Sequence, residues 1–527
     1  MNRMRLGSFT IAAVVVLSSL ARPGAGLAQP TNKAFIFDAG TRTVTALELP
    51  SAKVLATLPL EGSPQAMLAS PDGSRLIVLD RGPGDDKGDR GYKAKGKSAA
   101  TVVDSATLAV VARVELGWGI EPPGGFFSAD GSRLAVICPG YDAKNAAEAL
   151  PRELVTLDPR TGQVTGRLAL ERGPVAVRET RDGRTLLLVE GLPRGSYPSF
   201  AQSRLWSVDL AGPSIAARVD LGAFGFLEAD EQADQLYIVS GGVGKDANKQ
   251  EGELRVVRGA DLAATLKVAP HPRLVAREGE LVYVVGEKAV TLVDPVGLRV
   301  VATLSLGSEG KSLVDEDDAP TELKTSPDGK HGFVLYGLDE RLVVLDLEQK
   351  KAIGATKTGR GGKKFLRGLG NVAAWSAALS GGAMGQILAA PLRFRGGPAS
   401  QALVVRPDGL FAYALDVKNK DVTVVDANTA EAVEKIGGGG RELQLLTGGT
   451  AVAAASGSEI LLLDTASNKK ATVVELPGFR SLVLSPDGAH AVALGERTVL
   501  CLDGTTGKEL ARLTSFGKPE AVIFAQH

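Results

Sequence analysis

Residues 70–79 read Ser70-Pro71-Asp72-Gly73-Ser74-Arg75-Leu76-Ile77-Val78-Leu79, a polar turn followed by an apolar run. An Asp-Gly pair between apolar runs predicts a β-hairpin, because glycine adopts a positive φ without steric cost. The same pair recurs along the chain, as Asp72-Gly73, Asp130-Gly131, Asp182-Gly183, Asp328-Gly329, Asp408-Gly409 and Asp487-Gly488. One turn repeated every few tens of residues predicts a fold built from a repeated unit.

Each unit contains four expected strands. A short apolar strand, such as residues 76–79, follows the Asp-Gly turn; a third strand usually ends in aspartate, as at Asp104; and a polar turn leads to a fourth strand, such as residues 110–116. Weaker turns near Asp234, Gly279 and Gly448 add degenerate units, which brings the number of complete units to nine. Consecutive short strands joined by tight turns predict four-stranded antiparallel sheets.

The two ends of the chain complement each other. Residues 33–60 contain three expected strands and lack a first one, whereas the C-terminal strand 519–525 has no partner after it. Pairing the first and last strands closes a ring and removes its exposed sheet edges. We therefore predict an all-β fold over residues 29–527, a β-propeller of about 8–10 four-stranded antiparallel blades closed by its N- and C-terminal strands.

Residues 33–60, continued by 63–64 and 70–73, resemble a repeat of the YVTN-type β-propeller family, and residues 421–430 resemble another. The resemblance extends over residues 33–527 apart from one insertion. It implies a propeller and leaves function open, because this repeat hosts many activities. Asparagine of the family's naming tetrapeptide is replaced by Asp38, Asp80 and Asp416. Similar propellers include lactonases and haem-binding nitrite reductases, but no motif here matches their site residues.

The N-terminus has the three parts of a secretory signal peptide. Arg3 and Arg5 precede an apolar run over residues 6–20, and the small residues Gly26 and Ala28 follow. This pattern predicts a signal peptide over residues 1–28, cleaved after Ala28, and a periplasmic or secreted mature protein. The alternative is an uncleaved anchor, although the run is shorter than the roughly 20 residues that a membrane span requires. No later stretch is long and apolar enough for a span.

Composition excludes several classes of function. Lysine plus arginine and aspartate plus glutamate both number 60, so bulk charge does not favour nucleic acid as a partner. Two cysteines and four histidines are too few for a disulfide scaffold or a multi-histidine metalloenzyme. Residues 91–98 match the phosphate-loop pattern by letter, but residues 99–103 read as a strand where that site requires a helix. We expect no cofactor and no disulfide between Cys138 and Cys501.

Long connections are expected on one face only. In an antiparallel blade the first-to-second and third-to-fourth connections share one face, and the second-to-third and inter-blade connections share the other. All the long connections belong to the second group: residues 81–98, 117–125, 139–152, 191–203, 241–252, 307–320 and 358–399. Binding residues concentrate in long loops on a rigid scaffold, so this face is the expected working face. The alternative is neutral drift of surface loops.

The loops contain candidate site residues. Aromatic loop residues are typical binding anchors, and local packing of each loop is the alternative for Tyr92, Trp118, Tyr141, Tyr197, Phe200 and Trp375. Two acidic clusters are weak candidates for Ca²⁺ and are otherwise solvated loops: Asp85, Asp86 and Asp89, and Asp315, Glu316, Asp317 and Asp318.

The insertion over residues 358–399 has apolar residues at helical spacing. Phe365, Leu369, Val372, Ser376 and Leu379 fall at helical spacing, with Trp375 beside them. Such a helix could plug the central channel, dock a partner or touch a membrane surface. It could equally cap its own blade.

These observations favour an exported soluble propeller that binds a protein or a small molecule through its long-loop face. One alternative is a propeller enzyme, either a lactonase-like hydrolase or a redox enzyme, with its site at the central channel. Another is a structural component of the cell envelope. The identity of the ligand stays open at this stage.

Overall fold

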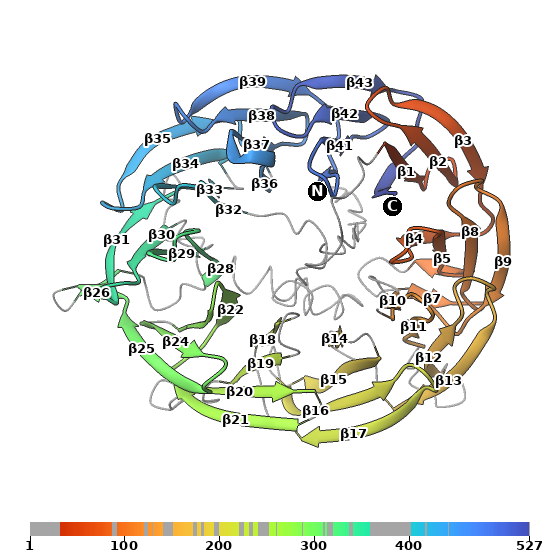
Figure 1. Cartoon of the computed structure of the whole chain (residues 1–527), viewed down its shortest axis with the longest axis horizontal. Coiled ribbons are helices and arrows are strands. Elements are labelled where there is room, and N and C mark those ends of the chain that lie inside the picture. The colour runs from red at the N-terminus through yellow and green to blue at the C-terminus, as the bar shows by residue number, and fades with distance from the viewer. Residues whose placement is uncertain are drawn as a thin grey trace, which may run out of the picture.

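The computed structural model describes residues 32–525 except 87–91, 121–124, 129, 141–150, 172–175, 181–183, 194–199, 221–225, 231–234, 241–251, 260, 287, 309–310, 314–319, 337–340, 359–401, 417–418 and 441. The described residues form ten four-stranded antiparallel sheets arranged around a central axis, so the fold is the predicted β-propeller and its blade number is ten. Figure 1 shows one strand of each blade nearest the centre and another on the outer wall.

The blades are numbered here in chain order, and their strands are given from the channel outward. Blades 1 to 5 are β44 (Pro519–Phe524), β1 (Lys33–Asp38), β2 (Thr43–Glu48) and β3 (Lys53–Pro59); β4 (Pro64–Ala69), β5 (Arg75–Asp80), β8 (Ala99–Asp104) and β9 (Val110–Glu115); β10 (Gly125–Phe127), β11 (Leu134–Cys138), β12 (Arg152–Leu157) and β13 (Val164–Leu170); β14 (Ala176–Glu179), β15 (Thr185–Pro193), β16 (Phe200–Asp209) and β17 (Ser214–Asp220); β18 (Phe226–Asp230), β19 (Gln235–Ser240), β20 (Gly252–Arg258) and β21 (Asp261–Val268).

Blades 6 to 10 are β22 (Leu274–Glu278), β23 (Leu281–Val285), β24 (Ala289–Asp294) and β25 (Arg299–Ser305); β28 (Pro320–Thr325), β29 (His331–Tyr336), β30 (Arg341–Asp346) and β31 (Lys351–Lys357); β32 (Leu403–Val405), β33 (Phe411–Asp416), β34 (Asp421–Asp426) and β35 (Ala432–Gly437); β36 (Glu442–Leu445), β37 (Ala451–Ala455), β38 (Glu459–Asp464) and β39 (Lys469–Glu475); β40 (Ser481–Leu484), β41 (His490–Leu494), β42 (Val499–Asp503) and β43 (Glu509–Leu513). Two small hairpins, β6 (Gly84–Asp86) with β7 (Tyr92–Ala94) and β26 (Gly307–Ser308) with β27 (Lys311–Ser312), and the 3₁₀ turn η5 (Thr447–Gly449) lie in connections.

The position of a strand in its blade explains its sequence pattern. The second and third strands, such as β5 and β8, are buried along almost their whole length because neighbouring blades cover both faces of the sheet. A strand buried on both faces reads as a continuous apolar run rather than an alternating one. The outermost strands, such as β9, alternate between exposed and partly exposed residues because their outer part borders solvent.

The hydrophobic core lies between blades rather than within them. Ile77 and Val102 of blade 2 pack in one cluster with Leu134 and Val155 of blade 3. The same arrangement joins the last blade to the first, where Val492 of β41 packs with Ile36 of β1. Each such residue is almost fully buried, and complete burial of one aliphatic side chain stabilises the fold by about 1.5–3 kcal/mol.

The ring closes as predicted. β44 pairs antiparallel with β1, and the register runs from Ala34 opposite Phe524 to Asp38 opposite Pro519. The amide of Ala525 donates to the carbonyl of Lys33 at 2.9 Å, so the two ends of the described chain are hydrogen-bonded to each other. Blade 1 therefore combines strands from both ends of the sequence.

Candidate functional site

The described strands divide the connections into two sets, one on each face of the ring. First-to-second and third-to-fourth connections are all short, and the longest of them cover residues 128–133 and 158–163. We call the face that carries them the tight-turn face. The second-to-third and inter-blade connections leave from the opposite face, which we call the long-loop face, and they include residues 81–98, 139–151, 241–251, 306–319 and 358–402. The predicted asymmetry between the two faces is therefore present.

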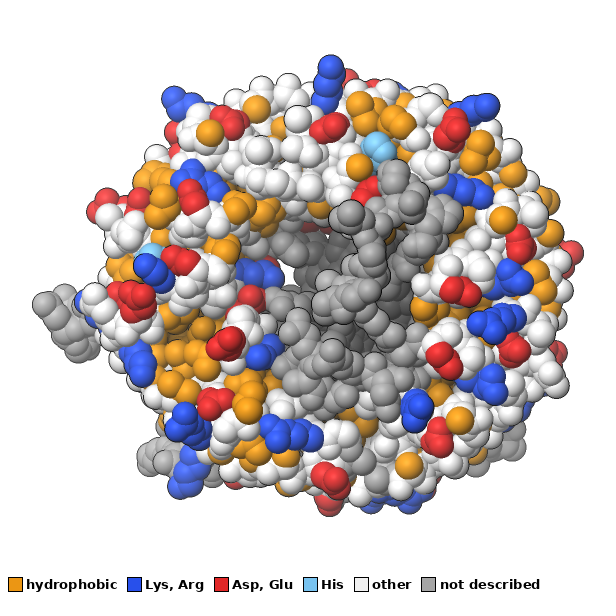
Figure 2. Space-filling view, viewed as in Figure 1, with side chains coloured by type: hydrophobic (Ala, Val, Ile, Leu, Met, Phe, Trp, Pro, Cys, Tyr) orange, Lys and Arg blue, Asp and Glu red, His pale blue; other side chains and the backbone are white. Residues whose placement is uncertain are grey.

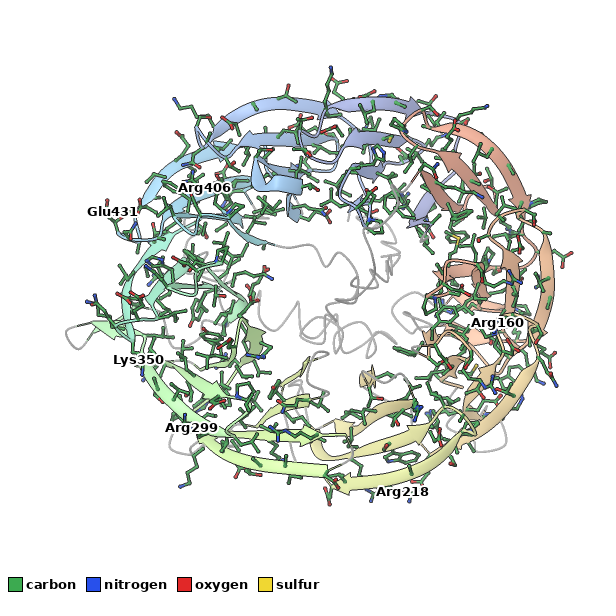
Figure 3. All side chains as sticks on the ribbon, in the orientation of Figure 1. Arg160, Arg218, Arg299, Lys350, Arg406 and Glu431 are labelled. Carbon is green, nitrogen blue, oxygen red and sulfur yellow. The ribbon has the colours of Figure 1, made fainter. Side chains whose placement is uncertain are left out.

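The tight-turn face fastens neighbouring blades together. A side chain of one blade donates a hydrogen bond to a carbonyl in the third-to-fourth turn of the next blade in four places: Lys33 to Ser105 at 2.8 Å, Arg258 to Pro295 at 2.8 Å, Arg406 to Thr465 at 2.7 Å and Thr450 to Thr505 at 3.0 Å. Figure 3 labels charged residues of these turns, among them Arg160, Lys350, Arg406 and Glu431, along the ring. Repeated links of this kind give the tight-turn face a structural role.

On the long-loop face, the connections of blades 2 and 3 bond to one another. The Ser98 hydroxyl donates to the carbonyl of Gly117 at 2.7 Å, and the Gly117 amide donates to the Cys138 thiol at 3.2 Å. The Gly140 amide donates to the carbonyl of Trp118 at 3.0 Å. These bonds join three connections into one surface. The first follows β11, the second precedes β8 and the third follows β9. We call it the loop platform, made of residues 95–98, 116–120 and 138–140.

Buried anchors hold the loop platform against the blades. Leu116 and Ile120 are almost fully buried in the core between blades 2 and 3, on either side of the half-buried Trp118. Burial raises the pKa of Cys138 to about 11, so its thiol stays protonated and acts as a packing group rather than a nucleophile. At the edge, Lys97 pairs with Glu115 at 2.6 Å.

The other predicted site residues are placed only in part. Tyr92 lies in β7, Asp85 and Asp86 lie in β6, and Phe200 begins β16, but only the backbone of these residues is described. The remaining candidates lie outside the described residues: Asp89, Tyr141, Tyr197, Asp315, Glu316, Asp317, Asp318 and Trp375. The same holds for the expected signal peptide, residues 1–28, and for the insertion 358–399 apart from Thr358.

One expected long loop is instead a hairpin. Residues 191–203 were expected to form a connection, but β15 and β16 stay paired through Gly191–Ser203 and Leu192–Gln202 as far as Pro193–Phe200. The strands of this blade therefore extend beyond the sheet on the long-loop face. Long strand pairing and a long loop look alike in a sequence where Gly, Pro and Ser interrupt the apolar pattern, which is why the extension was missed.

Two carboxyl groups at the channel wall were also missed, Glu442, which is buried, and Glu322, which is half-buried. Glu322 of β28 and Glu442 of β36 lie in innermost strands at the end nearest the long-loop face. Burial raises the pKa of both, that of Glu442 to about 7. A single glutamate in a short strand carries no sequence signal of burial, because the residues that cover it come from the next blade.

A shallow depression of about 820 Å³ lies elsewhere, between the outer parts of blades 9 and 10. Leu462 and Val474 belong to its apolar lining, and Arg512 pairs with Glu509 at its rim. It opens widely to solvent beside the tight-turn face.

The face seen in Figure 2 has no dominant charge. Figure 2 shows lysine and arginine interspersed with aspartate and glutamate around the viewed face. Within the described part of the chain, no three His, Cys, Asp or Glu side chains come together in a way that could hold a metal ion. A search of the same residues found no helix long and apolar enough to cross a membrane.

Comparison with known proteins bears on the fold alone. No protein-family model and no curated protein matches this sequence. A crystal structure of the eukaryotic initiation factor shares 10% identity, with 94% of this chain and 99% of that chain covered and a TM-score of 0.50.

Two further structures are less similar. Dihydro-heme d1 dehydrogenase NirN in complex with DHE shares 14% identity over 99% of this chain and 82% of that chain, with a TM-score of 0.38. Apo AztD from Citrobacter koseri shares 11% identity over 93% and 97%, with a TM-score of 0.37. At such identities the likeness concerns the fold alone, so function is argued from the chain's own residues.

Proposed function

We propose that this protein is an exported β-propeller that acts as a binding or protein-interaction module through its long-loop face. The observation that supports this proposal is the unequal use of the two faces. One face consists of short turns that link blade to blade, whereas the other has every long connection and a hydrogen-bonded loop platform around Trp118. A half-buried tryptophan on a supported loop is a typical anchor for a partner.

Site-specific photocrosslinking tests which face binds. A photoreactive phenylalanine analogue replaces Lys97 or Trp118 on the loop platform, and Val296 on the tight-turn face serves as the matched control. Val296 is 80% exposed in the β24–β25 turn, so the control is at least as accessible as the test positions. We expect one partner to crosslink at residues 97 and 118 and not at residue 296. Equal crosslinking at all three positions contradicts the proposal.

Binding of the purified partner to the Trp118→Ala variant then gives the magnitude. Loss of an interface tryptophan anchor is expected to weaken affinity by about 2 kcal/mol or more, which is roughly thirtyfold. Metal analysis and an absorbance spectrum of the purified protein complete the test. A tightly bound chromophore or metal would favour a propeller enzyme instead.

Export is a separate part of the proposal. It rests on the basic, apolar and small-residue segments of residues 1–28. We expect intact-mass measurement of the protein from the periplasm or medium to give a chain that begins at Gln29. A full-length chain retained in the membrane fraction contradicts cleavage.

We also propose that the ten blades belong to the YVTN-type repeat family. The support is the repeated strand and turn pattern quoted for residues 33–60 and 421–430. Sequences of close homologues test it, because an Asn in place of Asp38, Asp80 or Asp416 in those homologues would restore the family's tetrapeptide. Homologues with no trace of the pattern at these positions would contradict it.

A further inference from the structure

Glu322 and Glu442 occupy the same position in two different blades. Glu322 lies opposite Leu335 in blade 7, and Glu442 lies opposite Ala455 in blade 9, which are equivalent registers of the first and second strands. The equivalent residues in five other blades are uncharged: Ala66, Leu274, Ala402, Ser481 and Ala521. The fold therefore does not require an acid at this position.

Both carboxyl groups reach the next blade. Oε2 of Glu322 accepts a hydrogen bond from the Ala402 amide at 3.0 Å, immediately before β32 of blade 8. Oε1 of Glu442 accepts one from the Leu482 amide at 3.3 Å, in β40 of blade 10. Each glutamate thus ties the innermost strand of its own blade to the innermost strand of the following one.

Glu442 is buried and makes no ion pair among the described residues, although Arg480 immediately precedes β40, two residues before Leu482. Strands β36, β37, β40 and β32 contain no other ionisable residue, and His490 lies at the far end of β41, beside Asp503. Arg441 lies outside the described residues. Burial raises the pKa of Glu442 to about 7, and the hydrogen bond from Leu482 offsets only part of that effect.

Glu322 has charged neighbours. Burial raises its pKa, Lys324 and the amides of Ala402 and Leu403 lower it, and Glu278 raises it. Lys324 is itself paired with Glu278 at 3.7 Å, which reduces the share of its charge that stabilises an ionised Glu322. His331 begins β29 at the opposite end of the blade.

We propose that Glu322 and Glu442 form a protonation-sensitive fastening of the ring, which holds blade 7 to blade 8 and blade 9 to blade 10 while the carboxyls are neutral and weakens when they ionise. A neutral carboxyl keeps the hydrogen bond that the next blade supplies and carries no charge to be desolvated. An ionised Glu442 loses its hydration without gaining an ion pair, and an ionised Glu322 gains only the part of the Lys324 charge that Glu278 leaves uncompensated. Local opening of the two innermost strands restores that hydration, so ionisation favours opening.

The sign of the pH dependence follows from the raised pKa. The stabilisation from Glu442 is complete below the ordinary carboxyl pKa of 4.5 and is lost as the pH rises to about 7. Between these values the equilibrium constant for opening around Leu482 increases up to about tenfold per pH unit, and it levels off above them.

Amide hydrogen exchange of the full-length protein, corrected for intrinsic rates, measures this opening at β40 and at the start of β32. We expect the equilibrium constant for opening at β40 to rise steeply with pH in the wild type. In Glu442→Gln, which keeps a carbonyl acceptor and cannot ionise, we expect it not to change with pH. Glu322→Gln should flatten the profile at residue 402. Glu475→Gln, an exposed glutamate of the same blade, is the matched control and should leave both profiles unchanged.

Infrared titration of the wild-type protein keeps the proposal testable if a variant fails to fold. We expect a band from a protonated carboxyl that disappears near pH 7. Absence of that band, or a pH-dependent opening at β40 that persists in folded Glu442→Gln, overturns the proposal.

Discussion

At the residue scale, aspartates at strand ends hold the connections. Asp38 ends β1, and its carboxylate accepts hydrogen bonds from the amides of Gly517 at 2.6 Å and Lys518 at 2.7 Å, just before β44. It also accepts from Gly40 and Thr41 in its own loop. Burial opposes ionisation of Asp38, but these amides outweigh it and lower the pKa of the carboxyl. One side chain thus joins the two ends of the sequence.

We expect Asp38→Ala to destabilise the protein by about 2–3 kcal/mol, because two amides across the closing pair of strands lose a charged acceptor. The loss of unfolding free energy in Asp38→Ala relative to the wild type should be largest above the ordinary carboxyl pKa of 3.8. It should shrink as the pH falls below that value, since protonation removes the charge in the wild type. Urea denaturation at pH 7 and pH 3 measures both effects.

Asp503→Ala is the control, because the hydrogen bonds that the Asp503 carboxylate accepts come from its own exposed turn, from the amides of Thr505 and Thr506 and the Thr506 hydroxyl. We expect Asp503→Ala to lower the free energy of unfolding clearly less than Asp38→Ala does. Equal losses for both variants would mean that Asp38 acts on its own loop rather than on ring closure.

At the element scale, the Asp-Gly turn owes its stability to the serine that precedes it. The Ser70 hydroxyl donates to Asp72 at 2.6 Å and accepts from the Arg75 amide at 3.0 Å, while Gly73 adopts a φ of +67°. Ser128, Ser326 and Ser485 repeat the same bonds. The turn is therefore a small hydrogen-bonded unit, which explains why it can be recognised in the sequence.

We expect Ser70→Ala to cost about 1–2 kcal/mol, because the Arg75 amide and Asp72 both lose a partner. Ser70→Thr should cost much less, since Thr180 already accepts from the amide of Thr185 in the equivalent turn of blade 4. Thermal unfolding of the two variants measures the difference. Similar melting of Ala and Thr variants would contradict a role for the hydroxyl.

Elements were predictable from sequence where their causes are local. The Asp-Gly turns, the apolar second strands and the aspartate at the end of the third strand each depend on residues within a few positions. The continued pairing of β15 with β16 and the hairpin β6–β7 were not predicted, since Gly-rich and charged stretches carry little strand signal. Burial of Glu442 depends on Leu482, forty positions away in the chain.

At the scale of the whole molecule, β44 closes the ring, because it pairs with β1 and covers what would otherwise be an exposed edge of blade 1. Val522 of β44 is fully buried in the core that joins blades 10 and 1, and Ala521 and Ile523 contribute to the core between blades 1 and 2. Closure was predictable because the missing first strand and the unpaired last strand are visible at opposite ends of the sequence, whereas the blade number was predicted only as about 8–10. The loop platform was predictable only in outline, as a face.

We expect deletion of residues 519–527 to abolish cooperative thermal unfolding, because it exposes the edge of β1 and opens two core clusters at once. Circular dichroism and size-exclusion chromatography measure the loss. The control is a circular permutant that joins residue 525 to residue 33 through a short linker and opens the chain in the β38–β39 turn, which keeps every strand. A truncated protein that melts like the intact one would contradict closure by β44.

The direction of the strands in blade 1 also decides where the molecule can be held. β1 starts and β44 ends on the tight-turn face, so Lys33 and Ala525 emerge together on the side opposite the loop platform. A tether attached at either terminus would present the loops outward to solution. Immobilisation through the C-terminus on a sensor surface, or display on a particle, should therefore leave the recognition side unobstructed.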